Sequence, residues 1–268
     1  MIGVFDSGYG GLTVLKEFVK LAPEYDYLYL GDNARTPYGT RSFETVYKYT
    51  LECVKHLFDS GCRLIILACN TASAKALRSI QQNDLQPHQR VLGVIRPSAE
   101  VIEKYTQSGA VGVLGTVGTV QSLSYPIEIA KINPQIQVFQ EACPMWVPLV
   151  ENNEYQNDGA DFFVRKHIDN LLRQNPDIDV IMLACTHYPL LIDKIRKYTP
   201  ARVKILSQGS IVAQSLLDYL QRHTKMNNQL TKNGLRKFIT TDSPEMFDKY
   251  ATIFFGENVK SEKTFQFF

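Results

Sequence analysis

The stretch Val180-Ile-Met-Leu-Ala-Cys-Thr-His-Tyr-Pro-Leu190 decides the fold, because it has the pattern of a buried strand that ends at a cysteine. After Cys185, Pro189 opens a segment whose apolar residues recur at helical spacing. The thiol is therefore expected between the carboxyl end of a strand and the amino end of a helix. Ligands bind at that edge of an open α/β sheet, and a helix amino end lowers the pKa of a nearby thiol.

A second copy of this pattern occurs earlier in the chain, as Leu64-Ile-Ile-Leu-Ala-Cys-Asn-Thr-Ala-Ser-Ala74. Two glycine-bearing strand and turn segments, which begin at Ile2 and Val111, are separated by a distance comparable to that between Cys69 and Cys185. A shared offset of two features indicates an internal repeat. We predict two similar units that face each other, each of which contributes one cysteine.

The repeat and the surrounding apolar runs predict an α/β fold of two similar domains. Each domain is expected to be a mostly parallel sheet flanked by helices, with a pseudo-twofold relation and the active site between them. The first domain is assigned to residues 1–95 plus 211–268 and carries Cys69, and the second to residues 96–210 and carries Cys185. Three stretches are expected to lack regular structure: 96–98, most of the proline-containing 141–151, and the polar 225–233.

The composition is that of an ordinary globular protein. The 268 residues are 44% hydrophobic and 21% charged, with a formal net charge of +2, so charge gives no reason to expect a nucleic-acid or membrane partner. The sequence shows no signal-peptide pattern and no apolar run of the ~20 residues that cross a bilayer, so we expect a cytoplasmic protein. The five cysteines are expected to be free thiols, with the three outside the repeated pattern in the core: Cys53, Cys62 and Cys143.

The spacing of the cysteines disfavours metal and redox chemistry. Zinc would need Cys69, Cys185 and His187 to converge on one point, and no Cys-x-x-Cys or His-x-x-x-His spacing supports such a site. A disulfide exchanger would also carry Cys-x-x-Cys. We therefore expect no metal and favour acid–base chemistry.

Two thiols on opposite sides of one ligand suit the inversion of a carbon centre. A thiolate removes a proton from one face of the carbon, while a thiol delivers a proton to the other face. The pKa of a thiol lies nearer neutrality than that of a lysine, and a helix dipole can lower it further. The loops at Ser7, Thr71, Thr116 and Thr186 offer hydroxyl and N–H donors that would stabilise the developing negative charge.

Four motifs, in order along the chain, resemble those of the glutamate racemases. They are Asp6-Ser-Gly-Tyr-Gly-Gly-Leu-Thr13, Pro37-Tyr-Gly39, Ala68-Cys-Asn-Thr-Ala-Ser73 and Cys185-Thr-His-Tyr-Pro-Leu-Leu191, and the resemblance extends to Thr240-Thr-Asp242. It implies a cofactor-independent racemase that interconverts L- and D-glutamate and supplies D-glutamate for bacterial peptidoglycan. Two departures stand out: Tyr9, where the family usually has a small residue, and Arg96, where it usually has glutamate.

The resemblance also implies roles for particular residues. Cys69 would act on D-glutamate and Cys185 on L-glutamate, with Asp6, Glu151 and His187 assisting the thiols. Substrate contacts would come from Asp6, Ser7, Tyr38, Gly39, Asn70, Thr71, Thr186 and His187, with Thr116 and Thr119 from the second unit. The alternative for His187 is a capping residue near a helix start. Glutamate is the only ligand that we expect, and we expect a homodimer.

Two other functions remain open on sequence alone. A sister racemase could act on aspartate or another acidic amino acid, because one methylene changes affinity only modestly. A non-catalytic module could bind an amino acid between two lobes with both cysteines merely buried. The polar residues that follow each thiol, Asn70-Thr71 and Thr186-His187, disfavour that module, because a buried core thiol does not need them.

Overall fold

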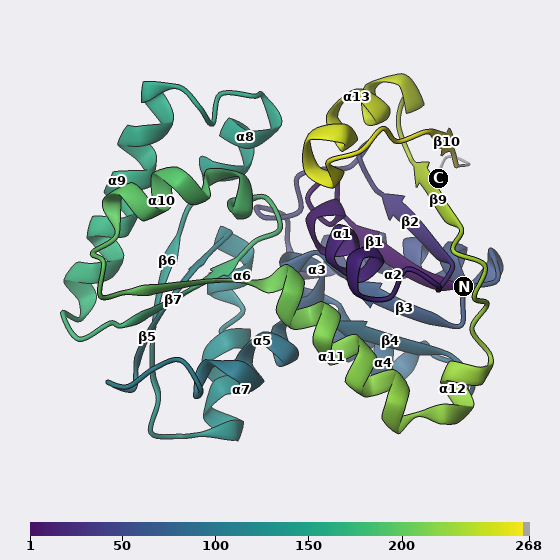
Figure 1. Cartoon of the computed structure of the whole chain (residues 1–268), viewed down its shortest axis with the longest axis horizontal. Helices are drawn as coiled ribbons and strands as arrows, with labels where there is room; N and C mark the ends of the chain where they lie inside the picture. The colour runs from purple at the N-terminus through teal and green to yellow at the C-terminus, as the bar shows by residue number, and fades with distance from the viewer. Residues whose placement is uncertain (265–268) are drawn as a thin grey trace.

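The computed structural model describes residues 1–264 and contains two separate sheets (Figure 1). The strand order is β10-β9-β2-β1-β3-β4 in the larger sheet and β6-β5-β7-β8 in the smaller, and every neighbouring pair is parallel. The strands of the larger sheet are β1 (Ile2–Asp6), β2 (Tyr27–Gly31), β3 (Leu64–Leu67), β4 (Arg90–Gly93), β9 (Arg236–Thr240) and β10 (Ser261–Lys263). Those of the smaller sheet are β5 (Ala110–Gly115), β6 (Gln137–Ala142), β7 (Val180–Ala184) and β8 (Lys204–Ser207).

Helices cover the sheets and account for the continuous burial of the central strands. The helices around the larger sheet are α1 (Leu12–Leu21), α2 (Phe43–Asp59), α3 (Asn70–Lys75), α4 (Leu77–Asn83), α12 (Thr224–Asn228) and α13 (Pro244–Phe255). The others are α5 (Ile95–Ile102), α6 (Val117–Gln121), α7 (Ser124–Ile132), α8 (Trp146–Glu151), α9 (Asp158–Gln174), the 3-10 helix η1 (Tyr188–Leu191), α10 (Ile192–Tyr198) and α11 (Gln208–Arg222). The predicted α/β class with two parallel sheets and flanking helices is confirmed.

Four strands have the same order in both sheets. The arrangement β2-β1-β3-β4 in the larger sheet corresponds to β6-β5-β7-β8 in the smaller one. Because Cys69 follows β3 and Cys185 follows β7, the two cysteines leave equivalent strands of the two sheets. Strands β9 and β10, from the end of the chain, extend the larger sheet beside β2. Figure 1 shows α3, α6 and the start of α11 lying between the two sheets.

Two predicted breaks are in fact helical. Helix α5 runs through Arg96-Pro97-Ser98, and α8 occupies the second half of the stretch 141–151. Pro97 and Pro148 are each the third residue of their helix, where a missing N–H costs no intrahelical hydrogen bond. Arg96 is exposed and pairs with Glu100 in the next turn, with an Nε–Oε1 distance of 2.9 Å.

The polar stretch 225–233 is also more ordered than the sequence predicts. Its first residues belong to α12, which ends at Asn228. Near its other end, the carboxylate of Asp26 accepts hydrogen bonds from the backbone N–H groups of Asn233 and Leu235, both at 2.9 Å. The side chain of the residue directly before β2 therefore fixes a segment that has few apolar residues of its own.

Candidate active site

The two cysteines of the repeated pattern line one cavity of about 110 Å³. Eight of the predicted site residues line it together with Cys69 and Cys185: Ser7, Tyr38, Gly39, Asn70, Thr71, Thr116, Thr186 and His187. The structure thus brings loops from both sheets to one point. The lining contains no lysine or arginine, so His187 is its one basic side chain.

Three further predicted residues lie behind the lining and bond to it. The Asp6 carboxylate accepts a hydrogen bond from Thr186 Oγ1 at 3.3 Å. Thr119 Oγ1 lies 3.1 Å from Thr116 Oγ1. Glu151 Oε1 lies 2.9 Å from His187 Nε2. These three side chains are therefore placed to act through a neighbour.

Cys185 has a basic partner two residues further along the chain. Its Sγ lies 3.9 Å from His187 Nδ1. The other ring nitrogen of His187, Nε2, contacts the Glu151 carboxylate. Burial opposes the charged imidazole, but the hydrogen bonds to Cys185 and Glu151 outweigh it and raise the pKa of His187 to about 10. The imidazolium of His187 is therefore the cationic neighbour of the Cys185 sulfur.

The position of His187 depends on a close approach by Gly10. A Cβ at Gly10 would lie 2.2 Å from Thr186 Oγ1 and 2.5 Å from His187 Nδ1, so only glycine fits. The next turn adds a bond between the two units, in which Thr13 Oγ1 donates to the Thr186 carbonyl at 3.0 Å. The glycine loop after β1 therefore supports the segment that follows Cys185.

An aromatic group from α13 covers the far side of His187. The Phe254 ring meets the imidazole edge to face, with centroids 5.3 Å apart. Tyr9 packs among Phe247, Tyr250 and Phe254, with centroid distances of 5.5 to 5.9 Å. The large side chain at position 9 therefore fills space between the glycine loop and the end of the chain.

Cys69 has different neighbours. It caps α3, where its Sγ accepts a hydrogen bond from the Ala72 N–H at 3.4 Å, and Ser7 Oγ lies 3.5 Å away. Burial, with a contribution from the Asp6 carboxyl, raises the pKa of Cys69 to about 12. Burial also raises the pKa of Asp6 itself. Cys69 is therefore a neutral thiol at neutral pH.

Two contacts across the cavity wall join the units. Thr71 Oγ1 lies 2.9 Å from Thr116 Oγ1, and the Gly118 N–H donates to the Gly39 carbonyl at 2.8 Å. Tyr38, next to Gly39, donates its hydroxyl to the buried Asp32 carboxylate, which also pairs with Arg35 at 2.7 Å. The loop that carries Tyr38 and Gly39 is therefore anchored on both sides.

The sequence analysis missed part of the lining. The missed residues are Thr36, Pro37, Thr40, Val117, Cys143, Pro144, Val147 and Pro148. Cys143 is buried, as predicted, and it also faces the cavity, which the sequence analysis did not foresee. Its place after β6 was the available signal, because this strand end lies at the same edge of the sheet as that of β7.

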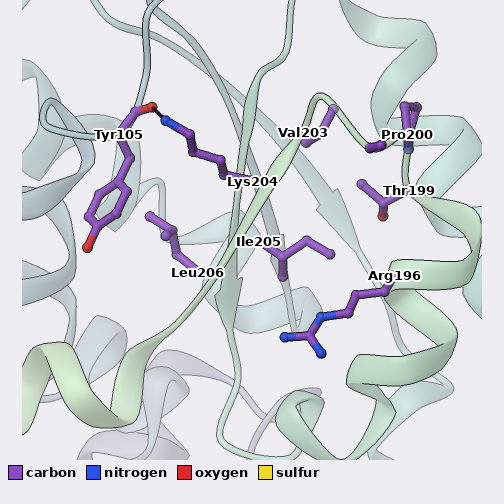
Figure 2. Close-up of a pocket in the computed structure, with 9 residues that line it drawn as sticks. Tyr105, Arg196, Thr199, Pro200, Val203, Lys204, Ile205 and Leu206 are labelled. Carbon is purple, nitrogen blue, oxygen red and sulfur yellow. Dashed lines mark hydrogen bonds between the residues drawn. The ribbon is translucent and has the colours of Figure 1, made fainter.

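A second hollow of about 460 Å³ lies beside β8 (Figure 2), and neither Cys69 nor Cys185 lines it. Arg196 and Lys204 are its charged residues, and Lys204 Nζ donates to the Tyr105 carbonyl at 3.1 Å. It offers no thiol, imidazole or carboxylate for acid–base chemistry. Across residues 1–264, no group of three or more His, Cys, Asp or Glu side chains is arranged to hold a metal ion.

Residues 2–216 match the family model described as Asp/Glu/Hydantoin racemase. The chain belongs to the Asp/Glu/hydantoin racemase family. This racemase is 40% identical over 255 residues to a glutamate racemase of Geobacter metallireducens, a match that covers 95% of this chain and 92% of that protein. The enzyme is therefore an isomerase.

Solved structures agree with this assignment. The crystal structure of a glutamate racemase from Bacillus anthracis matches with a TM-score of 0.90 at 35% identity, covering 98% of this chain and 97% of that one. A glutamate racemase from Francisella tularensis, solved in complex with D-glutamate, matches with a TM-score of 0.87 at 31% identity, covering 98% and 96%.

Proposed function

We propose that this racemase interconverts L- and D-glutamate without a cofactor, with Cys69 and Cys185 as its acid and base. The observation that carries the proposal is that both thiols, from equivalent strands of two sheets, line a single cavity. The glutamate racemases to which the chain is similar support glutamate as the substrate.

The charges around the thiols suggest the order of proton transfers from L-glutamate. The Cys185 thiolate removes the α-proton, and the electron pair of the broken C–H bond spreads over the α-carbon and its carboxylate. The Cys69 thiol then delivers its proton to the opposite face, which yields D-glutamate, a Cys69 thiolate and a Cys185 thiol. The reverse reaction starts from that state, with Cys69 as the base for D-glutamate.

Neutral donors would bind the substrate carboxylates. The hydroxyls of Ser7 and Thr71 and the amide of Asn70 line the cavity, and such donors stabilise charge that develops in the transition state. Tyr38 and Thr186 also line it, with their hydroxyl hydrogens donated to Asp32 and Asp6. Gly39, Thr116 and His187 complete the proposed contacts. Asp6, Thr119 and Glu151 would position Thr186, Thr116 and His187 respectively.

We further propose the domain boundaries 1–95 plus 211–268 and 96–210. The chain passes between the sheets after β4 and after β8, which supports these limits. No helix within residues 1–264 is long and apolar enough to cross a membrane. A cytoplasmic homodimer that supplies D-glutamate for peptidoglycan completes the proposal.

Racemisation of L-glutamate in D₂O tests the proposal. The wild-type enzyme should form D-glutamate with deuterium at the α-carbon in the absence of added cofactor. Cys69→Ser and Cys185→Ser should each lower racemisation by about 100-fold or more. Full racemisation by either variant would contradict the two-thiol mechanism.

Aspartate is the alternative substrate, because it differs from glutamate by one methylene. The aspartate racemase of Picrophilus torridus shares the fold, with a TM-score of 0.56 at 20% identity. Parallel assays with L-glutamate and L-aspartate separate the two functions. A higher kcat/KM for L-aspartate would overturn the glutamate assignment.

A further inference from the structure

Asn70, which lines the cavity directly after Cys69, is the end point of a buried polar network that we call the amide relay. Its members are Asn70, Tyr125, Gln208, Ser98 and the Val94 carbonyl, and none of these four side chains is more than 3% exposed. The members come from α3, from α7, from the start of α5 and from the first residue of α11. The relay therefore lies where the chain passes between the two sheets (Figure 1).

The Val94 carbonyl fixes the direction of every hydrogen bond in the amide relay, because a carbonyl can only accept. Ser98 Oγ donates to it at 2.7 Å and so becomes the acceptor for Gln208 Nε2 at 2.8 Å. The second N–H of Gln208 goes to the Tyr125 hydroxyl at 2.6 Å. Both hydrogens of this amide are then used.

The bonds of Gln208 and Tyr125 also fix the orientation of the Asn70 side-chain amide. Its Nδ2 donates to Gln208 Oε1 at 2.5 Å, and its Oδ1 accepts from the Tyr125 hydroxyl at 2.8 Å. An amide nitrogen carries two hydrogens, and Asn70 donates one of them to Gln208. The second N–H of Asn70 therefore has no partner within the amide relay. The Asn70 carbonyl oxygen is already engaged by Tyr125. The cavity is therefore offered a donor rather than an acceptor.

We propose that Tyr125 and Gln208 are positioning residues that hold the Asn70 amide with its remaining N–H available to a substrate carboxylate. A reversed amide would present an oxygen to the anionic substrate and would leave buried donors and acceptors mismatched, which is costly. The inference deepens the proposed function and rests on it, because it takes the ligand of Asn70 to be a carboxylate.

Kinetics of Tyr125→Phe test the inference. Loss of the hydroxyl frees the Asn70 amide to turn, so KM for both glutamate enantiomers should rise about tenfold while kcat changes less than threefold. Tyr27→Phe is the matched control, because its buried hydroxyl donates only to carbonyls near the end of α1. It should change KM less than twofold, as should Ser98→Ala, because the Val94 carbonyl lies 3.4 Å from Gln208 Nε2 and can replace the lost acceptor.

A double variant shows whether Tyr125 acts through Asn70. In an Asn70→Ala background, Tyr125→Phe should add no further rise in KM. An unchanged KM in the single variant would overturn the inference, as would an equal rise in both backgrounds.

A second readout needs no substrate. In ¹⁵N NMR spectra of the free enzyme, the side-chain amide protons of Asn70 should exchange with solvent faster in Tyr125→Phe than in Tyr27→Phe. Absence of glutamate turnover by the wild-type enzyme would refute the proposed function, whereas equal exchange in the two variants would refute the amide relay.

Discussion

Cys69 and Cys185 follow equivalent strands of two sheets that share one strand order, yet the side chains around them differ in chemistry. Beside Cys185 stands an imidazole whose pKa is raised to about 10. Beside Cys69 stand a hydroxyl and the Asp6 carboxyl, and the pKa of this thiol is raised to about 12. The comparison teaches that the repeated fold supplies symmetric positions, whereas the surrounding side chains make one thiol a ready base and the other a ready acid.

Removal of the imidazole should have the largest effect on this difference. We expect His187→Asn to lower kcat/KM by about 100-fold, because the Cys185 thiolate loses its cationic partner. The equilibrium constant of a racemisation is unity, so kcat/KM must fall equally from L- and D-glutamate. A fall below threefold would show that His187 does not assist Cys185.

A substitution in the glycine loop after β1 can also disturb the surroundings of Cys185. Gly10→Ala places a Cβ against Thr186 and His187, so the free energy of unfolding should fall by about 2 kcal/mol and activity should fall with it. Urea unfolding and kcat/KM measure the two effects. Gly159→Ala is the control, because a Cβ there meets nothing within 4 Å. A Gly10→Ala variant as stable as this control would contradict the packing described.

Removal of the carboxylate behind His187 should have a smaller effect. Glu151→Gln keeps a hydrogen-bonding group but removes the negative charge that helps to raise the pKa of His187. We expect kcat/KM to fall about tenfold at neutral pH and its alkaline limb to move to lower pH. The pH profile of the exposed variant Glu257→Gln should match that of the wild type. An unshifted limb in Glu151→Gln would separate Glu151 from the titration of His187.

The pH dependence of stability tests the charge on His187 without any turnover. The pKa of His187 is raised on folding from its ordinary value near 6.5 to about 10. Its stabilising contribution is therefore complete below about pH 6.5, declines as the pH rises, and is lost above about pH 10. The difference in free energy of unfolding between wild type and His187→Asn should shrink across that interval. A constant difference would argue against the raised pKa.

Much of this comparison could be predicted from the sequence, because it depends on local patterns. The buried strands before Cys69 and Cys185 are uninterrupted apolar runs, and polar residues follow each thiol directly. Helices α5 and α8 could not be predicted in the same way, because each carries a proline that ordinarily ends a helix. Both prolines are tolerated because Pro97 and Pro148 fall in a first turn, where the helix needs no N–H donor.

The supporting contacts depend on residues far apart in the sequence and leave no local pattern. Asp6 meets Thr186 across 180 positions, and Asn70 meets Gln208 across 138. A buried glutamine at the start of a helix has the same sequence pattern as an ordinary polar first-turn residue. Its role becomes visible only once four elements meet around it.

The most direct test of the central claim is the entry of solvent deuterium into each glutamate enantiomer, measured separately for Cys69→Ser and Cys185→Ser. The remaining thiol can still remove and return a proton on its own face of the α-carbon. Cys69→Ser should therefore incorporate deuterium into L-glutamate and not into D-glutamate, and Cys185→Ser should do the reverse. Equal incorporation into both enantiomers by either variant would contradict two thiols that act on opposite faces.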